Sequence, residues 1–384
     1  MQVRFSRRTS WSLTENALAR RLAELRAAGA PLLDLTGGNP TTAGFSYPPV
    51  VLGDGRYDPA PLGLPAARAA VAGALAERGV EVRADRLLLT ASSSESYSFL
   101  LRLLCDPGDE VLVPAPSYPL LEYLAQLDDV VARPWPLVYA GEWHVDVEAV
   151  REAVGPRTRA ILLVSPNNPT GSYVRQEESA ALESLAAERG LALIVDEVFA
   201  DYPLDPGYSE RYLRSRDALL FGLGGLSKSA GLPQMKLGWI RLDGPEGLVL
   251  GALERLEIIA DTFLSVGTPV QATLPALLAA GDGVRAQILG RVRDNWRQAG
   301  EALRGASANL LHADGGWYAV VRLPRALSDE AWALAFLEDG VVVQPGWFFD
   351  FATEGHAVVS LITPPAIFGE GLARLVRRVE EVCS

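Results

Sequence analysis

The chain has 384 residues, of which 49% are apolar and 21% charged, and its formal net charge is −12 at pH 7. This length accommodates two domains with separate cores. The negative charge argues against a nucleic-acid partner or an anionic membrane partner, because both require a basic surface. Two cysteines, Cys105 and Cys383, form no disulfide framework and favour a reducing, cytoplasmic location. The three histidines are widely separated, so we expect no histidine-based metal site.

The first predicted element is a helix that starts at a capping box, residues 12–15, and stops at Gly29. A glycine-rich turn at residues 36–40 follows. Either the backbone N–H groups of this turn approach a ligand closely, or the turn simply reverses the chain. A Pro/Gly loop at 57–65 then precedes an alanine-rich helix. The sequence of the N-terminal region therefore predicts helices and loops that precede the main sheet.

Apolar strands then alternate with helices. Strands are predicted at 86–91, 110–114, 159–164, 191–195, 218–223 and 237–242. This alternation is typical of a mostly parallel sheet covered by helices on both faces. Long helices near 245–263 and 270–304 precede a smaller α+β unit with strands near 317–323, 341–344 and 357–362. We expect a large α/β domain at 46–284 and a small domain formed by residues 1–45 and 285–384.

Lys228 follows an apolar, glycine-rich segment that predicts a buried strand and its exit turn. A lysine at that place can be partly desolvated, which lowers the pKa of its amine and makes it a nucleophile for a carbonyl group. The segment is not a phosphate loop, because Ser227 stands where that motif needs glycine. The dinucleotide fingerprint fails at the same position.

Other polar residues also lie where predicted strands end. In sheets of this type ligands bind outside the carboxyl ends of the strands, so these residues should converge on one cleft. A phosphorylated aromatic aldehyde would suit them: serines at a helix N-terminus bind phosphate, a tyrosine stacks on a ring, an amide bonds a phenolate oxygen, and a buried acid meets a protonated ring nitrogen. Each of these residues, taken alone, also has a purely structural interpretation as an N-cap, a loop anchor, a turn residue or a strand end. The residues are Ser92, Ser93, Ser94, Tyr118, Asn168, Asp196 and Lys228.

This set resembles the class I/II aminotransferases, which are fold-type-I pyridoxal-phosphate enzymes, over essentially the whole chain. The matching pieces occur in the family's order: Gly38-Asn39-Pro40, Thr90 to Glu95, Pro116-Ser117-Tyr118, Ser165 to Gly171, Asp196-Glu197-Val198, Ser227-Lys228 and Gly238-Trp239.

The resemblance implies an aminotransferase that moves an amino group between an amino acid and a 2-oxo acid. Lys228 would hold pyridoxal 5′-phosphate as a Schiff base and act as general acid/base, and Asp196 would keep the pyridine nitrogen protonated. Gly38 and Asn39 would contact the substrate. A homodimer with shared active sites is also implied. The remaining cofactor-binding residues would be Ser92, Ser93, Ser94, Tyr118, Asn168, Ser227, Lys236 and, from the neighbouring subunit, Tyr57.

Three positions depart from the family pattern. Phe199 stands where a tyrosine usually donates to the ring oxygen, so the imine at Lys228 should stay protonated to higher pH unless Tyr202 substitutes. Lys236 stands where an arginine usually binds phosphate, which keeps the charge but loses the bidentate geometry. Val358 stands where an arginine usually binds the substrate carboxylate.

The missing arginine leaves two questions open. Arg322 is a candidate replacement, although it also reads as a strand end at the surface. Another pyridoxal-phosphate reaction, such as elimination, racemisation, decarboxylation or cyclisation of a specialised amino acid, remains the alternative function, because one fold hosts them all. A non-enzymatic cofactor-sensing module is not expected, because no basic helix-turn-helix segment is evident.

Overall fold

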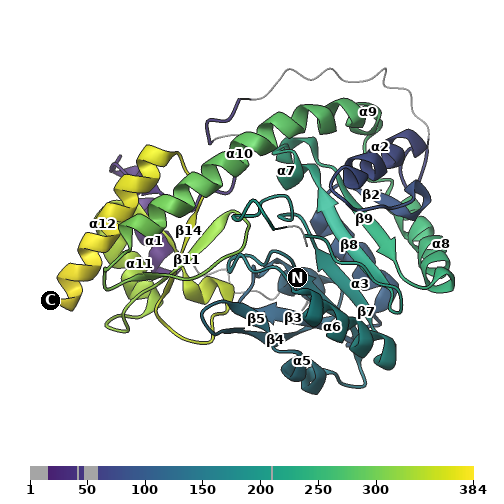
Figure 1. Cartoon of the computed structure of the whole chain (residues 1–384), viewed down its shortest axis with the longest axis horizontal. Coiled ribbons are helices and arrows are strands. Elements are labelled where there is room, and N and C mark those ends of the chain that lie inside the picture. Colours follow the sequence, from purple (N-terminus) through teal and green to yellow (C-terminus); the bar gives the residue numbers. More distant parts are fainter. Residues whose placement is uncertain (1–15, 41–42, 47–58, 209–210) are drawn as a thin grey trace, which may run out of the picture.

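The computed structural model describes residues 16–40, 43–46, 59–208 and 211–384. The predicted capping box at 12–15 and Tyr57 lie outside these residues. Helix α1 (Ala17–Ala27) follows Asn16, whose side chain accepts a hydrogen bond from the Ala19 N–H at 2.7 Å. Figure 1 shows a large unit around an extended sheet and a smaller unit beside it, with the long helix α10 (Leu274–Ala302) running along both.

The large unit is built on an eight-stranded sheet in the order β2-β9-β8-β7-β6-β3-β4-β5. Strand β9 is antiparallel to both neighbours, whereas β8, β7, β6, β3 and β4 pair in parallel. Strands β2 and β8 therefore run in the same direction, and the carboxyl ends of six strands meet at one edge. The strands are β2 (Leu87–Thr90), β3 (Glu110–Ala115), β4 (Val131–Tyr139), β5 (Trp143–Val145), β6 (Thr158–Val164), β7 (Ala192–Asp196), β8 (Leu220–Gly225) and β9 (Gly238–Asp243).

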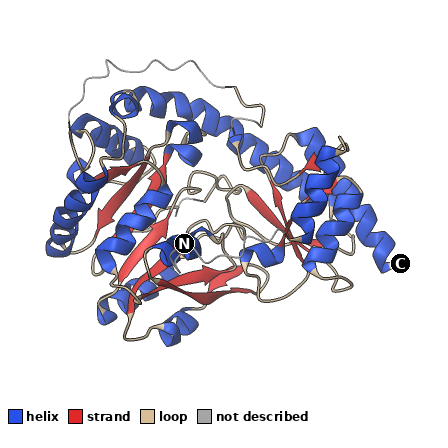
Figure 2. Cartoon of the chain, turned by 180° about the vertical axis from the view of Figure 1, so that it is seen from behind, coloured by secondary structure: helices blue, strands red, loops and turns tan. Residues whose placement is uncertain are grey.

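Helices cover both faces of this sheet (Figure 2). Alternate residues of β6 face opposite sides: Leu162 packs with α3, α4 and α8, whereas Ile161 and Leu163 pack with α5 and α6. This alternation is the period-two pattern of a strand buried on both faces. The helices are α2 (Pro65–Ala76), α3 (Ser93–Leu104), α4 (Leu120–Leu127), α5 (Val147–Ala153), α6 (Gln176–Arg189), α7 (Leu226–Ser229), α8 (Glu246–Phe263) and α9 (Thr268–Ala272), with 3₁₀ turns η3 (Ala84–Arg86) and η4 (Pro233–Met235).

The smaller unit holds a four-stranded antiparallel sheet in the order β10-β11-β14-β13 and a separate parallel pair, β1-β12. Its core joins Leu35 and Phe45 of the N-terminal segment to residues of α10, including Ile288. The predicted fold class, a mostly parallel helix-covered sheet plus a smaller α+β unit, is confirmed, while the domain limits at 45/46 and 284/285 stay a prediction. The elements are β1 (Leu33–Asp34), β10 (Asn309–Leu310), β11 (Tyr318–Arg322), α11 (Asp329–Glu338), β12 (Val341–Val342), β13 (Gln344–Pro345), η5 (Gly346–Phe349), β14 (His356–Ser360) and α12 (Pro365–Cys383).

The sequence analysis predicted no strand between residues 115 and 158, where the structure has β4 and β5. Two prolines, Pro134 and Pro136, lie within β4, and proline normally argues against a strand. The antiparallel partner β5 pairs only with residues 137–139 of β4, so the prolines lie where β4 forms the edge of the sheet. They are two residues apart, and their missing N–H donors therefore fall on the same side of the strand.

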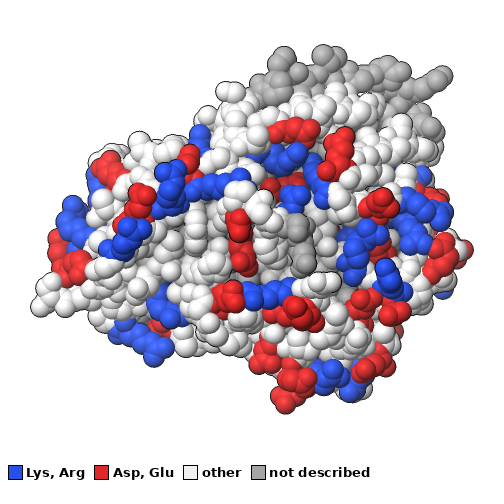
Figure 3. Space-filling model, viewed as in Figure 1, with Lys and Arg blue, Asp and Glu red and all other residues white. Residues whose placement is uncertain are grey.

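Acidic and basic side chains are interspersed on the face shown in Figure 3. In the part of the chain that the structure describes, no helix is long and apolar enough to cross a membrane. The same residues contain no group of three or more His, Cys, Asp or Glu side chains that could hold a metal ion.

Candidate active site

A pocket of about 370 Å³ lies at the edge where the parallel strands end. This volume is within the range of small-molecule sites. The structure brings Ser93, Tyr118, Asn168, Asp196 and Lys228 together in it, as the strand-end argument predicts. The other lining residues are Thr36, Tyr97, Ser117, Leu120, Leu121, Leu162, Val164, Val198, Phe199, Tyr318 and Gln344.

Lys228 lies in the short helix α7, which directly follows β8. Its Nζ is 4.7 Å from the centre of the Trp317 ring and 5.4 Å from that of Phe199. Burial lowers the pKa of the amine to about 8, although the Asp196 carboxylate opposes this shift. Roughly a tenth of Lys228 is therefore the neutral, nucleophilic amine at pH 7, far more than for an ordinary lysine.

Asp196 is the last residue of β7. Its Oδ2 accepts a hydrogen bond from the Tyr97 hydroxyl at 2.7 Å, and its Oδ1 accepts one from the Val198 N–H at 3.1 Å. Burial raises the pKa of Asp196, and these two bonds and the Lys228 charge oppose the rise. A further cation in the pocket would stabilise the carboxylate. The sequence analysis missed Tyr97, although it lies one helical turn after Ser93 on α3 and so faces the same side.

The N-terminus of α3 opens into the pocket. Ser92 caps the helix by accepting a hydrogen bond from the Glu95 N–H at 3.2 Å, and Ser93 lines the pocket. First-turn N–H groups have no partner within a helix and carry the positive end of its dipole, so this end favours an anion. Ser94 and Ser227 are half-buried and Lys236 is exposed, and none of the three lines the pocket.

Asn168 and Tyr118 provide two further contacts. The Asn168 Oδ1 is buried and has no hydrogen-bond partner among the described residues. A buried amide oxygen without a partner costs about 1–3 kcal/mol, so a ligand donor there would be stabilising. The Tyr118 ring is 47% exposed and packs at 6.1 Å, edge on, against Phe348. It keeps one side available to the pocket that it lines.

Gly38 approaches Tyr318 so closely that an added Cβ would come within 2.5 Å of the Tyr318 hydroxyl. A side chain at this turn would therefore force Tyr318 to move, and the next residue, Asn39, is exposed and does not line the pocket. Burial raises the pKa of Tyr318 to about 12, so its hydroxyl stays protonated. Tyr318 and Gln344 were not predicted as site residues, because both depend on how the small sheet docks against the large one.

The structure does not bring Arg322 into the pocket. It lies on β11 four residues beyond Tyr318, roughly 13 Å along the strand, and it is exposed with its guanidinium 5.1 Å from the Tyr139 ring centre. The hypothesis that Arg322 replaces the carboxylate arginine therefore lacks the required geometry. Tyr202 likewise uses its hydroxyl to donate to the main-chain carbonyl of Lys228 and does not line the pocket.

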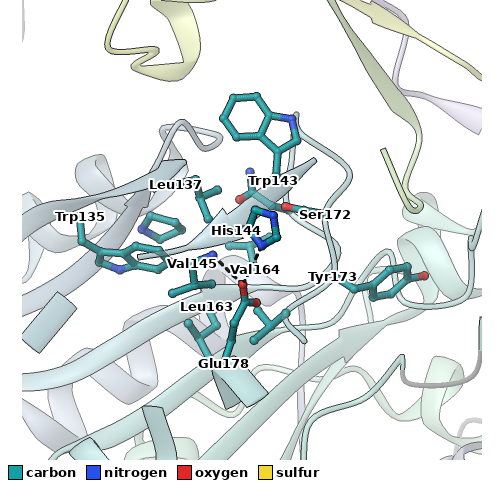
Figure 4. A pocket seen from close by; sticks show the side chains of 13 residues that line it. Trp135, Leu137, Trp143, His144, Val145, Leu163, Val164, Ser172, Tyr173 and Glu178 are labelled. Atoms are coloured by element: carbon teal, nitrogen blue, oxygen red, sulfur yellow. Dashed lines mark hydrogen bonds and ion pairs between the residues drawn. The ribbon is translucent and has the colours of Figure 1, made fainter. Parts of the chain in front are cut away.

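A second cavity, of only about 10 Å³, lies behind the loop that carries Asn168. Figure 4 shows its lining, in which Glu178 reaches β5 and accepts a hydrogen bond from the Val145 N–H at 2.9 Å. A space of this size holds about one water molecule. We assign it to packing between β5, β6 and α6 and not to ligand binding.

The fold is that of the fold-type-I pyridoxal-phosphate transferases. The family model for aminotransferase class I and II matches residues 57–364, and the chain belongs to this family. It is 30% identical over 271 residues to the glutamate-pyruvate aminotransferase AlaA of Escherichia coli K12. This alignment covers 68% of this chain and 66% of that protein, which is just under two thirds of its length. It is 27% identical to an alanine aminotransferase of Mycobacterium bovis, with 93% of this chain and 86% of the relative covered.

Solved structures show the same fold. An alanine aminotransferase from Pyrococcus furiosus superimposes with a TM-score of 0.87 at 23% identity, covering 98% of this chain and 100% of the other. A variant of the Thermus thermophilus aspartate aminotransferase gives a TM-score of 0.81 at 24% identity, with 98% and 100% covered.

Pyridoxal phosphate, the cofactor of this family, fits the residues present. The pocket offers a lysine of lowered pKa for its aldehyde, a buried carboxylate for its ring nitrogen and a helix N-terminus for its phosphate. Asn168 lies in the same pocket, where its amide Nδ2 would donate to the ring oxygen.

Proposed function

We propose that this protein is a pyridoxal-phosphate-dependent aminotransferase that moves an amino group between an amino acid and a 2-oxo acid. The observation that carries the proposal is the Lys228 amine, held in a pocket with its pKa lowered to about 8 and facing Asp196. The family match and the names of the relatives support this activity.

The bound cofactor would supply an electron sink for the carbon that carries the amino group. Lys228 Nζ would hold the cofactor and, once released, move a proton to or from that carbon. The Asp196 carboxylate would pair with the ring nitrogen, kept in place by Tyr97 and the Val198 N–H. The Ser93 end of α3 would hold the phosphate, Tyr118 would cover one face of the ring, and Asn168 would contact the ring oxygen.

Ser92, Ser94, Ser227, Lys236 and Tyr57 remain proposed phosphate contacts that rest on the resemblance alone. Ser92, Ser94 and Ser227 each adjoin a residue that lines the pocket, so small movements on binding would be needed to use their side chains. Asn39 remains a proposed substrate contact on the same ground.

Reduction with borohydride tests the assignment of Lys228. Purified protein incubated with pyridoxal phosphate, reduced, digested and analysed by mass spectrometry should carry a pyridoxyl group on the peptide that contains Lys228. Lys228→Ala should carry none, while Lys236→Ala should still be labelled at Lys228. Labelling at another lysine with Lys228 unmodified would refute the site.

A different pyridoxal-phosphate reaction is the second candidate. It is favoured by one observation: Val358, where the family places its carboxylate arginine, is fully buried among apolar side chains. Product analysis separates the two, because transamination leaves the cofactor in its amino form after a half-reaction, whereas elimination, racemisation or decarboxylation returns the aldehyde form.

We also infer a cytoplasmic homodimer with active sites at the subunit interface. The two free cysteines fit a reducing compartment. The homodimer rests on the resemblance to the family, and exposed apolar side chains such as Tyr123, Val131 and Ile258 are available for such a contact. Sedimentation of the purified protein should give twice the mass of the 41.2 kDa chain.

A further inference from the structure

The face of the small sheet that borders the pocket is apolar where a carboxylate-binding cation would be expected. In the antiparallel register, Val358 lies opposite Val320 on one side and opposite Gln344 on the other. Val358 is 0% exposed and packs in a cluster with Trp143, Leu311, Val320 and Phe349. Figure 4 shows the Trp143 indole directed away from the small cavity below it. The space next to Val358 is thus filled by side chains and is not kept open for a distant cation.

Gln344 projects into the pocket from the strand next to Val358. Cross-strand partners have Cβ atoms about 4.5–5.5 Å apart and share a face of the sheet, so Gln344 occupies nearly the place from which an arginine at 358 would reach. It lines the pocket together with Lys228, Asn168 and Tyr318. Its Oε1 is buried and has no hydrogen-bond partner among the described residues.

The charged side chains of the pocket are those assigned to the cofactor. Among the described lining residues only Asp196 and Lys228 are charged, and both are assigned to the cofactor. The remaining polar side chains, such as Asn168, Tyr318 and Gln344, are neutral. A carboxylate next to Gln344 would therefore be desolvated without an opposite charge from the described residues, which is costly. An amide or hydroxyl group would lose much less, and its N–H or O–H would donate to the buried Gln344 Oε1.

We propose that Gln344 determines substrate specificity by hydrogen-bonding a neutral substituent on the carbon that carries the amino group. This inference rests on the proposed aminotransferase function. Its preferred substrate class is an amino compound with an amide or alcohol in place of the free α-carboxylate. Ordinary amino acids are then the weaker partners, held without an ion pair.

Two measurements on the holoenzyme test this proposal. The first is binding, by calorimetry, of two unreactive analogues: propionamide should bind at least tenfold more tightly than propionate. The second is the half-reaction, in which L-alaninamide should convert the bound cofactor with a higher kcat/KM than L-alanine. Gln344→Leu should remove both preferences. Gln344→Arg, which restores a cation at this place, should reverse both toward the carboxylate.

Gln176→Arg is the matched control, since Gln176 is exposed at the start of α6, and it should leave both ratios unchanged. Should Gln344→Arg fail to fold, Gln344→Leu still decides the matter through the binding ratio. Tighter binding of propionate to the wild type, or ratios that Gln344→Leu leaves unchanged, would overturn the proposal. If no amino acid or amino acid amide in a panel of side chains converts the cofactor, the aminotransferase function itself fails and this inference with it.

Discussion

At the scale of single residues, the site depends on two buried charges that modify each other. Burial lowers the pKa of the Lys228 amine to about 8 and raises that of the Asp196 carboxyl, while each charge partly offsets the shift of the other. Tyr97, Val198 and the ring of Trp317 fix these groups in place. Burial therefore keeps part of Lys228 as the neutral, reactive amine, although the Asp196 charge opposes this effect.

The lowered pKa predicts how the apoprotein captures its cofactor. Only the neutral amine attacks an aldehyde, so the rate of pyridoxal-phosphate capture should rise with pH through an inflection near 8, well below the ordinary lysine value of 10.5. Because the Asp196 charge raises this pKa, Asp196→Asn should move the inflection lower. Stopped-flow absorbance measures both, and an inflection near 10.5 would contradict the burial of Lys228.

Phe199 predicts the behaviour of the bound chromophore. It lines the pocket where a hydroxyl would donate to the ring oxygen and thereby favour deprotonation of the adjacent nitrogen. A hydrogen bond to a charged group contributes about 1.5–3 kcal/mol, so Phe199→Tyr should lower the pKa of the visible chromophore by roughly 1–2 units. Spectrophotometric titration of the holoenzyme checks this. A titration curve that does not move would mean that position 199 does not reach the ring oxygen.

At the scale of elements, the junction of β8 and β9 explains the glycines that precede Lys228. A Cβ on Gly222 would come within 2.7 Å of the Glu197 carboxylate, and one on Gly224 would overlap the Trp239 indole. These glycines serve close packing against β9 and not the binding of a phosphate or dinucleotide. They also let Arg241, which is buried and bonds Glu197 at 3.0 Å, pass over the strand.

This packing predicts a clear stability difference between two glycines. Gly224→Ala should lower the free energy of unfolding by about 1–3 kcal/mol, because the Cβ would overlap the Trp239 ring. Gly300→Ala, in the α10 helix with open space at its Cβ, should be neutral or raise stability by up to about 1 kcal/mol. Urea denaturation of both variants gives the comparison. Equal effects would show that β8 tolerates side chains at this junction.

The elements also show which features the sequence was able to predict. Strands buried on both faces, such as β6 and β7, are continuous apolar runs, and the polar residues at their ends gave the site. Strand β4 was missed because proline normally argues against a strand, and β4 contains two prolines at the edge of the sheet. Tyr318 and Gln344 were missed because strand alternation places a side chain on a face but not against a distant sheet. Arg322 was a candidate for the same reason, since it shares its strand face with Tyr318, and it lies at the surface, as its alternative interpretation predicts.

At the scale of the whole molecule, the pocket joins the two units of the chain. Most lining residues come from the large sheet edge, whereas Tyr318, Gln344 and Thr36 come from the small unit and the N-terminal segment. Ser360 of β14 also donates a hydrogen bond to the Gly37 carbonyl, which ties that segment to the small sheet. A ligand in the pocket therefore contacts both units at once.

This arrangement predicts that the cofactor stabilises the entire chain. A ligand that binds only the folded state stabilises it by about 2.7 kcal/mol at a concentration one hundred times its dissociation constant. Pyridoxal phosphate should therefore raise the melting temperature of the wild type in a single transition. The increase should be much smaller in Lys228→Ala. A transition that splits, with only the large unit stabilised, would contradict coupling through the pocket.

The most direct test of the central claim is a single-turnover reaction of the holoenzyme with an amino donor and no oxo acceptor. We predict that the cofactor absorbance changes from the aldehyde form to the amino form, with one oxo product released per active site. Subsequent addition of a 2-oxo acid should restore the original spectrum. Product formation with the cofactor left in its aldehyde form would contradict amino transfer and favour another reaction at Lys228.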